Sequence, residues 1–598
     1  MIKERLAALK AAMKEADIDC YIIPTSDYHN SEYVSEYFMA RKYFSGFTGS
    51  AGTLVVLKDK AALFTDGRYF IQAAKQLQGS GITLMKMGEP KVPSLKEYVK
   101  QELKEGENIG FDGRVITAGD GLDFEKTAEE KGGKVIWNLD LAQKIWQDRP
   151  ALLFTPVFVL KEEYSGESCD DKLKRLREKM KEEGADVHLL TTLDDIAWLF
   201  NLRSKDVESC PVLLSYAVVT REEAILFAGE SAFDEAVRKY LAEHHIALKP
   251  YDDFYTYVAD MVKARPGEKL LVCENRINYR LKKELGDAVI VDRANPTTLM
   301  KAIKNRTEQD NLRRAHLMDG VAVTKFMYWL KTNVGKIPMT EVSASDYLES
   351  LRAENPTYIE PSFATICAYG ANGAIIHYTA TPEAYSEIQA KGMLMVDSGG
   401  HYYEGSTDIT RTFILGEITE EMRQHFTLVA RAMLRLKNTR FLYGCKGVNL
   451  DLAAREVFWE KGLDYKHGTG HGVGYLLNVH EGPNSFRYKV LPGNDNDWVF
   501  EEGMVTTDEP GIYIEGSHGV RIENELLCRK GDNNEYGQFM EFEDLTYVPI
   551  DLDGLDVSAM ENSEIQVLNR YHKTVYEKLE PFFDGKELDW LKNATREL

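Results

Sequence analysis

The residues best suited to chemistry lie in three short clusters of acids and histidines in the second half of the chain. The first cluster, at 395–413, reads MVDSGGHYYEGSTDITRTF. An apolar run ends at Asp397, a glycine turn follows, and Asp408 begins a second strand. A hairpin folded about 402–403 places the two aspartates opposite or diagonal to each other. Two close carboxylates repel unless a cation lies between them, so the pair is either a metal site or a set of ordinary turn aspartates.

The second cluster, at 467–483, reads HGTGHGVGYLLNVHEGP. His467 and His471 are four residues apart, as in a helical zinc motif, but the glycines disfavour a helix and no glutamate follows the first histidine. A dinucleotide-binding loop would need a preceding strand, whereas the helical pattern LDLAAREVFWEKG precedes this segment. We expect the glycines to let the backbone approach a substrate or a metal closely.

The third cluster, at 506–527, reads TTDEPGIYIEGSHGVRIENELL. Glu509 precedes a Pro-Gly break. Glu523 is expected on a strand with Arg521 and Glu525 on the same face, so Arg521 is predicted to orient the Glu523 carboxylate. Glutamates on strands usually face solvent, and each of these residues taken alone has that alternative interpretation.

Taken together, the three clusters offer four carboxylates and one imidazole. These five side chains are Asp397, Asp408, His471, Glu509 and Glu523. Two divalent cations would neutralise the four negative charges and leave one position for a bridging hydroxide. An oxygen-rich set with one histidine suits Mn²⁺ best, and Co²⁺, Fe²⁺ and Zn²⁺ stay open.

An internal repeat indicates the elements that carry these clusters. RLAALKAAMKEADIDCYIIPT at 5–25 matches KLKRLREKMKEEGADVHLLTT at 172–192 in one register. Each copy is typical of an amphipathic helix, a short turn and an apolar strand. The sequence therefore predicts two related α/β domains in tandem.

A third domain is predicted to begin near residue 305, where Asn305 and Glu308 have the spacing of a capping box before a long helix. From about residue 360, short apolar strands alternate with glycine-rich turns. A last helix is expected at 563–579, with an apolar stripe for packing. The predicted domains are 1–157, 158–304, 305–550 and 551–598.

Composition bounds the remaining possibilities. A chain of 598 residues is too long to fold around a single hydrophobic core, so several domains are expected. The formal charge of −22 disfavours nucleic acid as a partner, because phosphate backbones require a basic face. Seven scattered cysteines favour a reducing compartment. With no secretory leader and no membrane-length apolar run, the protein is expected to be cytoplasmic.

The three clusters, together with GANGAIIHYTAT at 370–381, resemble the pita-bread metallopeptidases, and most closely the large, three-domain cytosolic form of aminopeptidase P. The resemblance runs essentially end to end. It implies two creatinase-like α/β domains followed by a pita-bread catalytic domain. It also implies hydrolysis of an N-terminal Xaa-Pro bond through a hydroxide bridging two metals, and a homodimer.

The resemblance also implies a role for each residue of the site. Asp397 would bind one metal and His471 the other, Asp408 and Glu523 would bridge them, and Glu509 would complete the second metal's ligands. The reacting peptide would contact His377 and His480. His467 and Arg521 are assigned to substrate binding, and Glu509 is the candidate proton shuttle to the leaving nitrogen.

Three rival interpretations stay open. A prolidase would cleave only Xaa-Pro dipeptides, a methionine aminopeptidase would remove only initiator methionine, and a non-catalytic pita-bread protein would serve as a binding module. The tandem repeat favours aminopeptidase P over the first two, because those enzymes carry at most one such domain. The five filled ligand positions disfavour the third. A polar connection at 492–503 departs from the family pattern.

Overall fold

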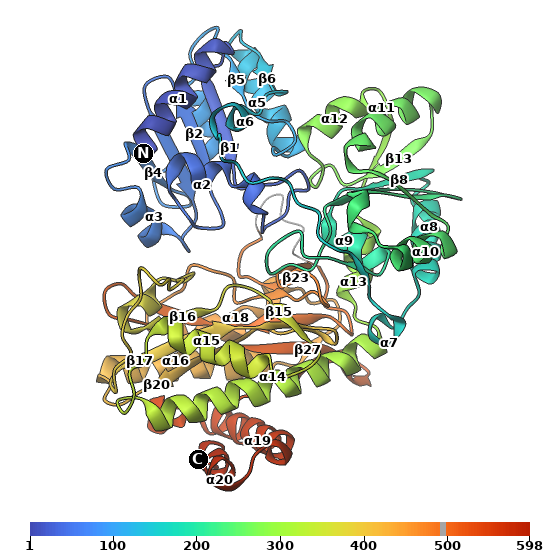
Figure 1. The fold of residues 1–598 in the computed structure, drawn as a ribbon. Coiled ribbons are helices and arrows are strands. Elements are labelled where there is room, and N and C mark those ends of the chain that lie inside the picture. The colour runs from blue at the N-terminus through green and yellow to red at the C-terminus, as the bar shows by residue number, and fades with distance from the viewer. Residues whose placement is uncertain (491–497) are drawn as a thin grey trace. The chain divides into compact units, whose positions relative to one another are not determined.

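The computed structural model describes residues 1–490 and 498–598 (Figure 1), so much of the polar connection predicted at 492–503 lies outside the described residues. All seven cysteines are free thiols. Among the described helices, none combines the length and the apolar character that a membrane span requires.

The chain divides into two compact units. The first holds residues 1–160 and 167–297, and the second holds residues 161–166 and 298–598. The domain boundaries expected at 157, 304 and 550 stay predictions.

The first unit contains the predicted repeat, and both copies build the same kind of sheet. Helix α1 (Ile2–Glu15) leads to strand β1 (Cys20–Pro24), and helix α8 (Cys169–Glu182) leads to strand β8 (Val187–Leu190). The strand orders are β4-β3-β2-β1-β5-β6 and β12-β11-β10-β8-β13-β14, so β1 and β8 occupy equivalent places. The other strands are β2 (Thr53–Leu57), β3 (Ala61–Thr65), β4 (Ile82–Lys86), β5 (Ile109–Gly110), β6 (Val135–Ile136), β10 (Ser215–Thr220), β11 (Ala224–Ala228), β12 (Ile246–Pro250), β13 (Lys269–Val272) and β14 (Val289–Asp292).

The apolar faces of the two repeated helices explain why both copies fold alike. Leu6, Leu9 and Met13 of α1 are buried. The equivalent residues of α8, Leu173, Leu176 and Met180, are buried as well. This spacing places one apolar stripe of each helix against its own sheet.

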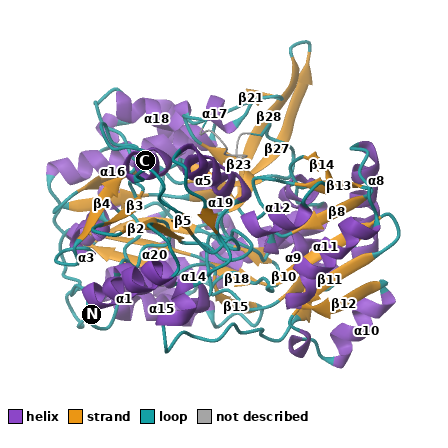
Figure 2. Ribbon diagram, turned by 90° about the horizontal axis from the view of Figure 1, so that it is seen from above, coloured by secondary structure: helices purple, strands orange, loops and turns teal. Residues whose placement is uncertain are grey.

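The second unit combines three sheets and a short hairpin. Their strand orders are β15-β18-β19, β16-β17-β20, β21-β28-β27-β24-β22-β23 and β25-β26. Strands β27 and β28 form a long hairpin (Figure 2). The bounds are β15 (Tyr358–Pro361), β16 (Ile366–Tyr369), β17 (Met393–Ser398), β18 (Gly400–Tyr402), β19 (Gly405–Ser406), β20 (Ile409–Ile414), β21 (Phe441–Leu442), β22 (Gly470–Gly472), β23 (Glu481–Phe486), β24 (Val505–Asp508), β25 (Gly511–Ile514), β26 (His518–Arg521), β27 (Asn524–Asn534) and β28 (Gly537–Asp544).

Helices pack against these sheets. Helix α14 (Arg306–Asn333) begins at the predicted capping box, in which the Asn305 side chain accepts from the Glu308 backbone and Glu308 caps Asn305 in return. Helix α15 (Glu341–Arg352) packs beside α14, and α16 (Glu420–Lys437) lies on the strands that carry the third cluster. Further helices are α13 (Pro296–Ala302), α18 (Leu452–Trp459), α19 (Asn562–Leu579) and α20 (Gly585–Ala594).

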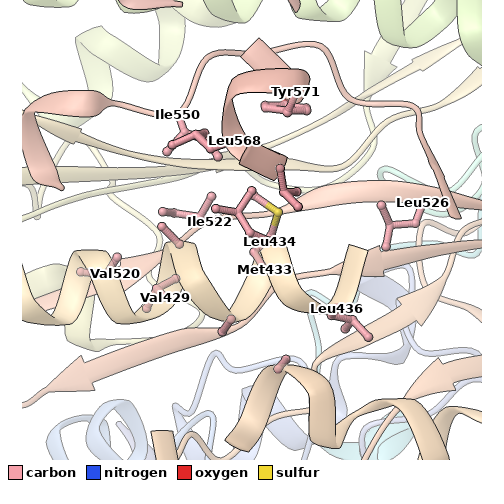
Figure 3. Close-up of a cluster of buried hydrophobic side chains, with 14 of the residues drawn as sticks. Val429, Met433, Leu434, Leu436, Val520, Ile522, Leu526, Ile550, Leu568 and Tyr571 are labelled. Atoms are coloured by element: carbon pink, nitrogen blue, oxygen red, sulfur yellow. The ribbon is translucent and has the colours of Figure 1, made fainter. Parts of the chain in front are cut away.

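The core of the second unit lies between α16 and α19 (Figure 3). Val429 and Met433 of α16 and Leu568 of α19 enter it together with Val520 and Ile522. Because side chains alternate along an extended chain, anchoring Val520 and Ile522 in the core directs Arg521 and Glu523 to the opposite side. Hydrophobic burial thus determines which face of this segment carries polar groups.

Helix α19 is joined to the same strands through Arg411 of β20. Arg411 is buried and donates to the Glu523 carbonyl at 2.6 Å and to the Tyr571 hydroxyl of α19 at 2.8 Å. The helix predicted at 563–579 is confirmed as a packing element, but it is not the last helix, because α20 follows it.

Two local predictions are met with small changes. Pairing of His401 with Ser406 and of Asp397 with Thr410 centres the first-cluster hairpin on residues 403–404, so Asp397 lies diagonal to Asp408. His471 lies on strand β22 and not on a helix, as expected. The close approach at Gly470 is to the protein's own backbone, since a Cβ there would lie 1.8 Å from the Thr507 carbonyl oxygen.

Gly399, in the first cluster, packs as closely against backbone as Gly470 does, and replacing it with alanine tests that contact. A Cβ at position 399 would lie 1.8 Å from the Thr407 carbonyl oxygen and 2.3 Å from Ser362 Oγ. We expect Gly399→Ala to destabilise the second unit by about 1–3 kcal/mol, measured by scanning calorimetry. Gly119→Ala is the matched control, since a Cβ there meets open space. Equal unfolding profiles for the two variants would contradict the prediction.

Candidate active site

Strands β17 and β20 bring the first two acids together. Asp397 lies near the end of β17 and Asp408 directly before β20. Both are buried. Asp397 Oδ2 accepts from Arg521 Nη2 at 2.5 Å, while Oδ1 is buried and has no hydrogen-bond partner in the described part of the chain. A buried carboxylate oxygen of this kind is a suitable donor atom for a cation.

Glu523 reaches the same place from the connection between β26 and β27. Its backbone N–H donates to the Thr410 carbonyl at 3.0 Å, and its Oε2 accepts from Thr410 Oγ1 at 2.6 Å. Thr410 lies opposite Asp397 in the β17–β20 pairing. One threonine therefore holds Glu523 beside the strand pair that carries the two aspartates.

His471 and Glu509 complete the cluster from β22 and from the residue after β24. The His471 backbone N–H donates to Thr507 Oγ1 at 3.0 Å, and its Nδ1 lies 2.9 Å from the Gly472 carbonyl. A carbonyl only accepts, so Nδ1 carries the proton and Nε2 presents a lone pair. Nε2 lies 3.4 Å from Asp408 Oδ2 and 3.7 Å from Glu509 Oε1.

The structure thus brings all five predicted ligands together. Three overlapping groups have donor atoms within 4.8 Å of one another: Asp397, Asp408 and Glu523; His471, Glu509 and Glu523; and Asp408, His471 and His480. Asp408, His471 and Glu523 each belong to two groups. His480 joins a ligand group as well, although the sequence assigned it only to the substrate.

Crowding shifts the protonation of this cluster. Burial, and then the charges of Asp397 and Glu509, raise the pKa of Asp408 well above its usual value. Burial, followed by Asp408, Asp397 and Glu509, raises the pKa of Glu523 in the same way. Asp408 and Glu523 therefore hold their protons to a higher pH than free carboxyl groups do, and a metal ion competes with those protons for the site.

Arg521 differs from its prediction. The guanidinium contacts Asp397 and the Tyr513 hydroxyl, the latter at 2.7 Å, and it does not orient Glu523. The two side chains do lie on the same side, since Arg521 Nε and Glu523 Oε2 both contact Thr410 Oγ1, at 3.4 and 2.6 Å, but the guanidinium pairs with the Asp397 carboxylate of β17. Thr410 takes the role that was expected of Arg521.

The two residues assigned to substrate binding are joined through Tyr513. Arg521 donates to the Tyr513 hydroxyl, which lies 2.9 Å from His467 Nε2. His467 Nδ1 lies 2.7 Å from the Gly468 carbonyl and therefore carries the proton, so Tyr513 donates to Nε2. Burial, and then Arg521, lower the pKa of His467 well below its usual value, so this imidazole is neutral at physiological pH.

His377 and His480 occupy two different loops. His377 follows the 3₁₀ turn η4 (Gly370–Ala374), which packs against β26, where a Cβ on Gly519 would lie 1.8 Å from the Gly373 carbonyl oxygen. His377 belongs to none of the three ligand groups found among the described residues. His480 lies with its ring 4.3 Å from that of His471.

A buried ion cluster fastens the chain next to His480. Lys304 Nζ lies 2.6 Å and Lys301 Nζ 3.2 Å from the two carboxylate oxygens of Glu481, and all three residues are buried. The Lys304 backbone N–H also donates to the Gly503 carbonyl. Sequence analysis missed these lysines and Tyr513, because lysines and a tyrosine outside the acidic clusters carry no spacing that marks them.

Comparison with known families follows the same division of the chain. Residues 5–136 and 148–308 each match the creatinase/prolidase N-terminal domain. Residues 310–530 match metallopeptidase family M24, and residues 538–598 match the C-terminal region of that family. These matches confirm the predicted fold class of two tandem creatinase-like α/β domains followed by a pita-bread domain.

Full-length relatives carry related names. The chain is 38% identical to a probable Xaa-Pro aminopeptidase P of Neurospora crassa, over 99% of this chain and 88% of that protein. It is also 38% identical to the protein of the same name from Tuber melanosporum, over 99% of this chain and 98% of the relative. The solved X-prolyl aminopeptidase of Caenorhabditis elegans, described as a cytosolic enzyme with a dinuclear active site, is 32% identical with a TM-score of 0.96 over 100% of both chains.

The raised pKa values predict that metal binding is linked to protons. Mn²⁺ added to metal-depleted protein at pH 7 should displace protons from Asp408 and Glu523, so its affinity should fall as the pH is lowered. Titration calorimetry in two buffers of different ionisation enthalpy measures the protons released. Glu523→Gln should release fewer. A heat independent of the buffer would contradict the prediction.

Proposed function

Since the chain belongs to metallopeptidase family M24 and to its Xaa-Pro aminopeptidase P branch, we propose that it removes the N-terminal residue from peptides whose second residue is proline. The observation that carries this proposal is the cluster of four carboxylates and one histidine, whose donor atoms overlap in shared groups. This donor set suits a pair of divalent metals that share ligands.

The residues present fit two divalent ions. Asp397, Asp408 and Glu523 would hold one, while His471, Glu509 and Glu523 would hold the other. Asp408 and Glu523 each belong to two groups and each carry two carboxylate oxygens, whereas His471 presents only Nε2, and this supports the assignment of the two carboxylates as bridging ligands. We propose Mn²⁺ as the metal, because oxygen donors dominate the set. When bound, such a pair supplies a water nucleophile near neutral pH and polarises the carbonyl to be cleaved.

The chain's own residues supply positioning and proton transfer. Glu509 stands beside His471 at the edge of the cluster, where its carboxylate can carry a proton to the leaving nitrogen. His480 lies at right angles to His471, with an interplanar angle of 88°, and can donate a hydrogen bond to the oxygen of the substrate carbonyl as charge develops there. His377 is assigned to the same reacting peptide.

Specificity for proline is carried over from the named relatives. The nitrogen of an Xaa-Pro bond bears no hydrogen and its ring fixes the backbone, so the site must accept a ring and protonate an imino leaving group. His467 and Arg521, joined through Tyr513, form the polar wall that we assign to substrate binding.

A proline dipeptidase remains the alternative within the family, and a non-catalytic binding module the alternative outside it. The two matched N-terminal domains favour the aminopeptidase. The complete set of five donors disfavours a protein that has lost its metals.

We further propose that the protein acts in the cytosol and forms a homodimer. The Caenorhabditis elegans enzyme is described as cytosolic. Trp459 and Tyr488 contact each other edge to face and are 43% and 37% exposed, which leaves apolar surface that a second copy can cover. Light scattering after size-exclusion chromatography should give twice the chain mass of 67.9 kDa, and a monomer mass would contradict the dimer.

The reaction is tested with metal-loaded protein and short peptides followed by mass spectrometry. An Xaa-Pro-Yaa tripeptide should lose its first residue, an Xaa-Ala-Yaa peptide should stay intact, and a chelator should abolish cleavage. Cleavage of Xaa-Pro dipeptides alone would favour the dipeptidase. No cleavage with Mn²⁺, Co²⁺, Fe²⁺ or Zn²⁺ would rule out the peptidase proposal.

His480→Ala separates two roles of that histidine. If His480 assists the reacting carbonyl, kcat should fall about 10²- to 10³-fold while two metals stay bound, as measured by elemental analysis. His244→Ala, on a histidine of the first unit outside the site, is the control and should keep full activity. Loss of one metal in His480→Ala would instead identify His480 as a ligand.

A further inference from the structure

Both aspartates of the candidate metal centre are flanked by a residue that is tied to one buried ion pair. Ser398 follows Asp397, and Thr407 precedes Asp408. We propose that the Asp319–Arg352 ion pair is a positioning device that holds these two neighbours, and thereby sets the separation of the Asp397 and Asp408 carboxylates for two metals. The inference rests on the proposed dinuclear function and extends it to residues outside the ligand set.

The ion pair joins two helices of the second unit. Asp319 lies on α14 and Arg352 ends α15. Arg352 Nε donates to Asp319 Oδ1 at 2.6 Å and Nη2 donates to Oδ2 at 3.3 Å, an arrangement that fixes both side chains. Asp319 is 0% and Arg352 1% exposed, so water does not compete for these bonds.

On the Asp408 side, the link runs through Thr407. Thr407 Oγ1 donates to Asp319 Oδ2 at 2.6 Å and accepts from the Gly400 backbone N–H at 2.9 Å. The Thr407 carbonyl accepts from Ser362 Oγ at 2.8 Å. The residue before Asp408 is therefore held through its side chain and its backbone at once.

On the Asp397 side, the link runs through Ser398. Arg352 Nη2 donates to Ser398 Oγ at 3.0 Å, with the hydroxyl buried beside the ion pair. Tyr402, between the two aspartates in sequence, donates its hydroxyl to Asp319 Oδ1 at 3.1 Å. The whole hairpin from Asp397 to Asp408 is thus anchored at both ends and near its turn to the same carboxylate–guanidinium pair.

Stability alone does not account for this arrangement. A buried ion pair seldom stabilises a protein more than well-packed apolar side chains of the same size would. What the pair does provide is direction, because a planar guanidinium and a carboxylate bind their partners at fixed angles. Partners of metal ligands commonly govern metal affinity in this way.

Orientation matters here because Asp397 and Asp408 must both be ionised to bind metal ions. Two ionised carboxylates repel each other, and a hairpin free to open would separate them. A hairpin held from behind keeps the carboxylates near the spacing that two bound ions need, so less of the binding free energy is spent on ordering the site.

The test measures Mn²⁺ binding to the metal-depleted full-length chain by titration calorimetry, with the EPR spectrum of the bound ions as a second readout. Thr407→Val keeps the shape of the side chain but removes the bond to Asp319. We expect it to weaken Mn²⁺ binding about 10- to 100-fold and to alter the spectrum of the paired ions. Ser398→Ala, which removes the partner of Arg352, should weaken binding in the same direction.

Two matched variants separate positioning from general stability. Thr407→Ser restores the hydroxyl and should recover most of the affinity. Thr324→Val is the second control. Thr324 lies on α14 and is fully buried like Thr407, but its Oγ1 has no hydrogen-bond partner in the described residues, so the change should leave Mn²⁺ binding unchanged. Thermal unfolding of each variant shows whether it is folded at the temperature of the titration.

Wild-type affinity and spectrum in both Thr407→Val and Ser398→Ala would overturn the positioning role while leaving the dinuclear enzyme intact. An equal loss of affinity in Thr324→Val and Thr407→Val would overturn it too, since the effect would then be general destabilisation. Failure of the unaltered chain to bind Mn²⁺ would instead refute the proposed function, and the inference with it.

Discussion

Four carboxylates that share one buried site impose the main constraint on the second unit. Burial and the neighbouring charges raise the pKa values of Asp408 and Glu523 well above their usual range when no cation is present. Such a cluster opposes folding, because each acid brings charge or an unsatisfied proton into a region with little water. Arg521 offsets one carboxylate, and Thr410 supplies one hydrogen bond to another. Divalent cations are the remaining means of balancing the charge.

The surrounding architecture keeps the acids in place against this repulsion. Apolar side chains of the core fix the segment at 520–522 from behind, and Arg411 ties it to helix α19. The Asp319–Arg352 pair anchors the hairpin that carries the two aspartates, and Lys304 with Glu481 anchors the loop of His480. In each case a buried contact acts on the backbone of a site residue or on the residue next to it. The precision of the site therefore depends on residues that touch neither metal nor substrate.

Sequence alone predicted several features that depend on local patterns, although it missed helix α20. Repeated apolar stripes indicated the two α/β domains, and the Asn305–Glu308 spacing placed the start of α14. The glycines around His471 indicated that it is not on a helix, because glycine has a low helix propensity. Residue types and order also indicated the five candidate ligands, and the resemblance to the pita-bread metallopeptidases assigned a role to each of them.

Only the tertiary structure decided how these residues pair. Arg521 was expected to orient Glu523, but it pairs with Asp397 of β17, and the pattern of one strand cannot reveal which carboxylate of a distant strand lies nearest. Asp319, Arg352 and Lys304 lie far in sequence from the residues they hold, and none belongs to a recognisable spacing. Periodicity and composition report which face of an element is buried. The partner of a buried polar group is determined by how distant elements pack, and that information appears only when the chain is folded.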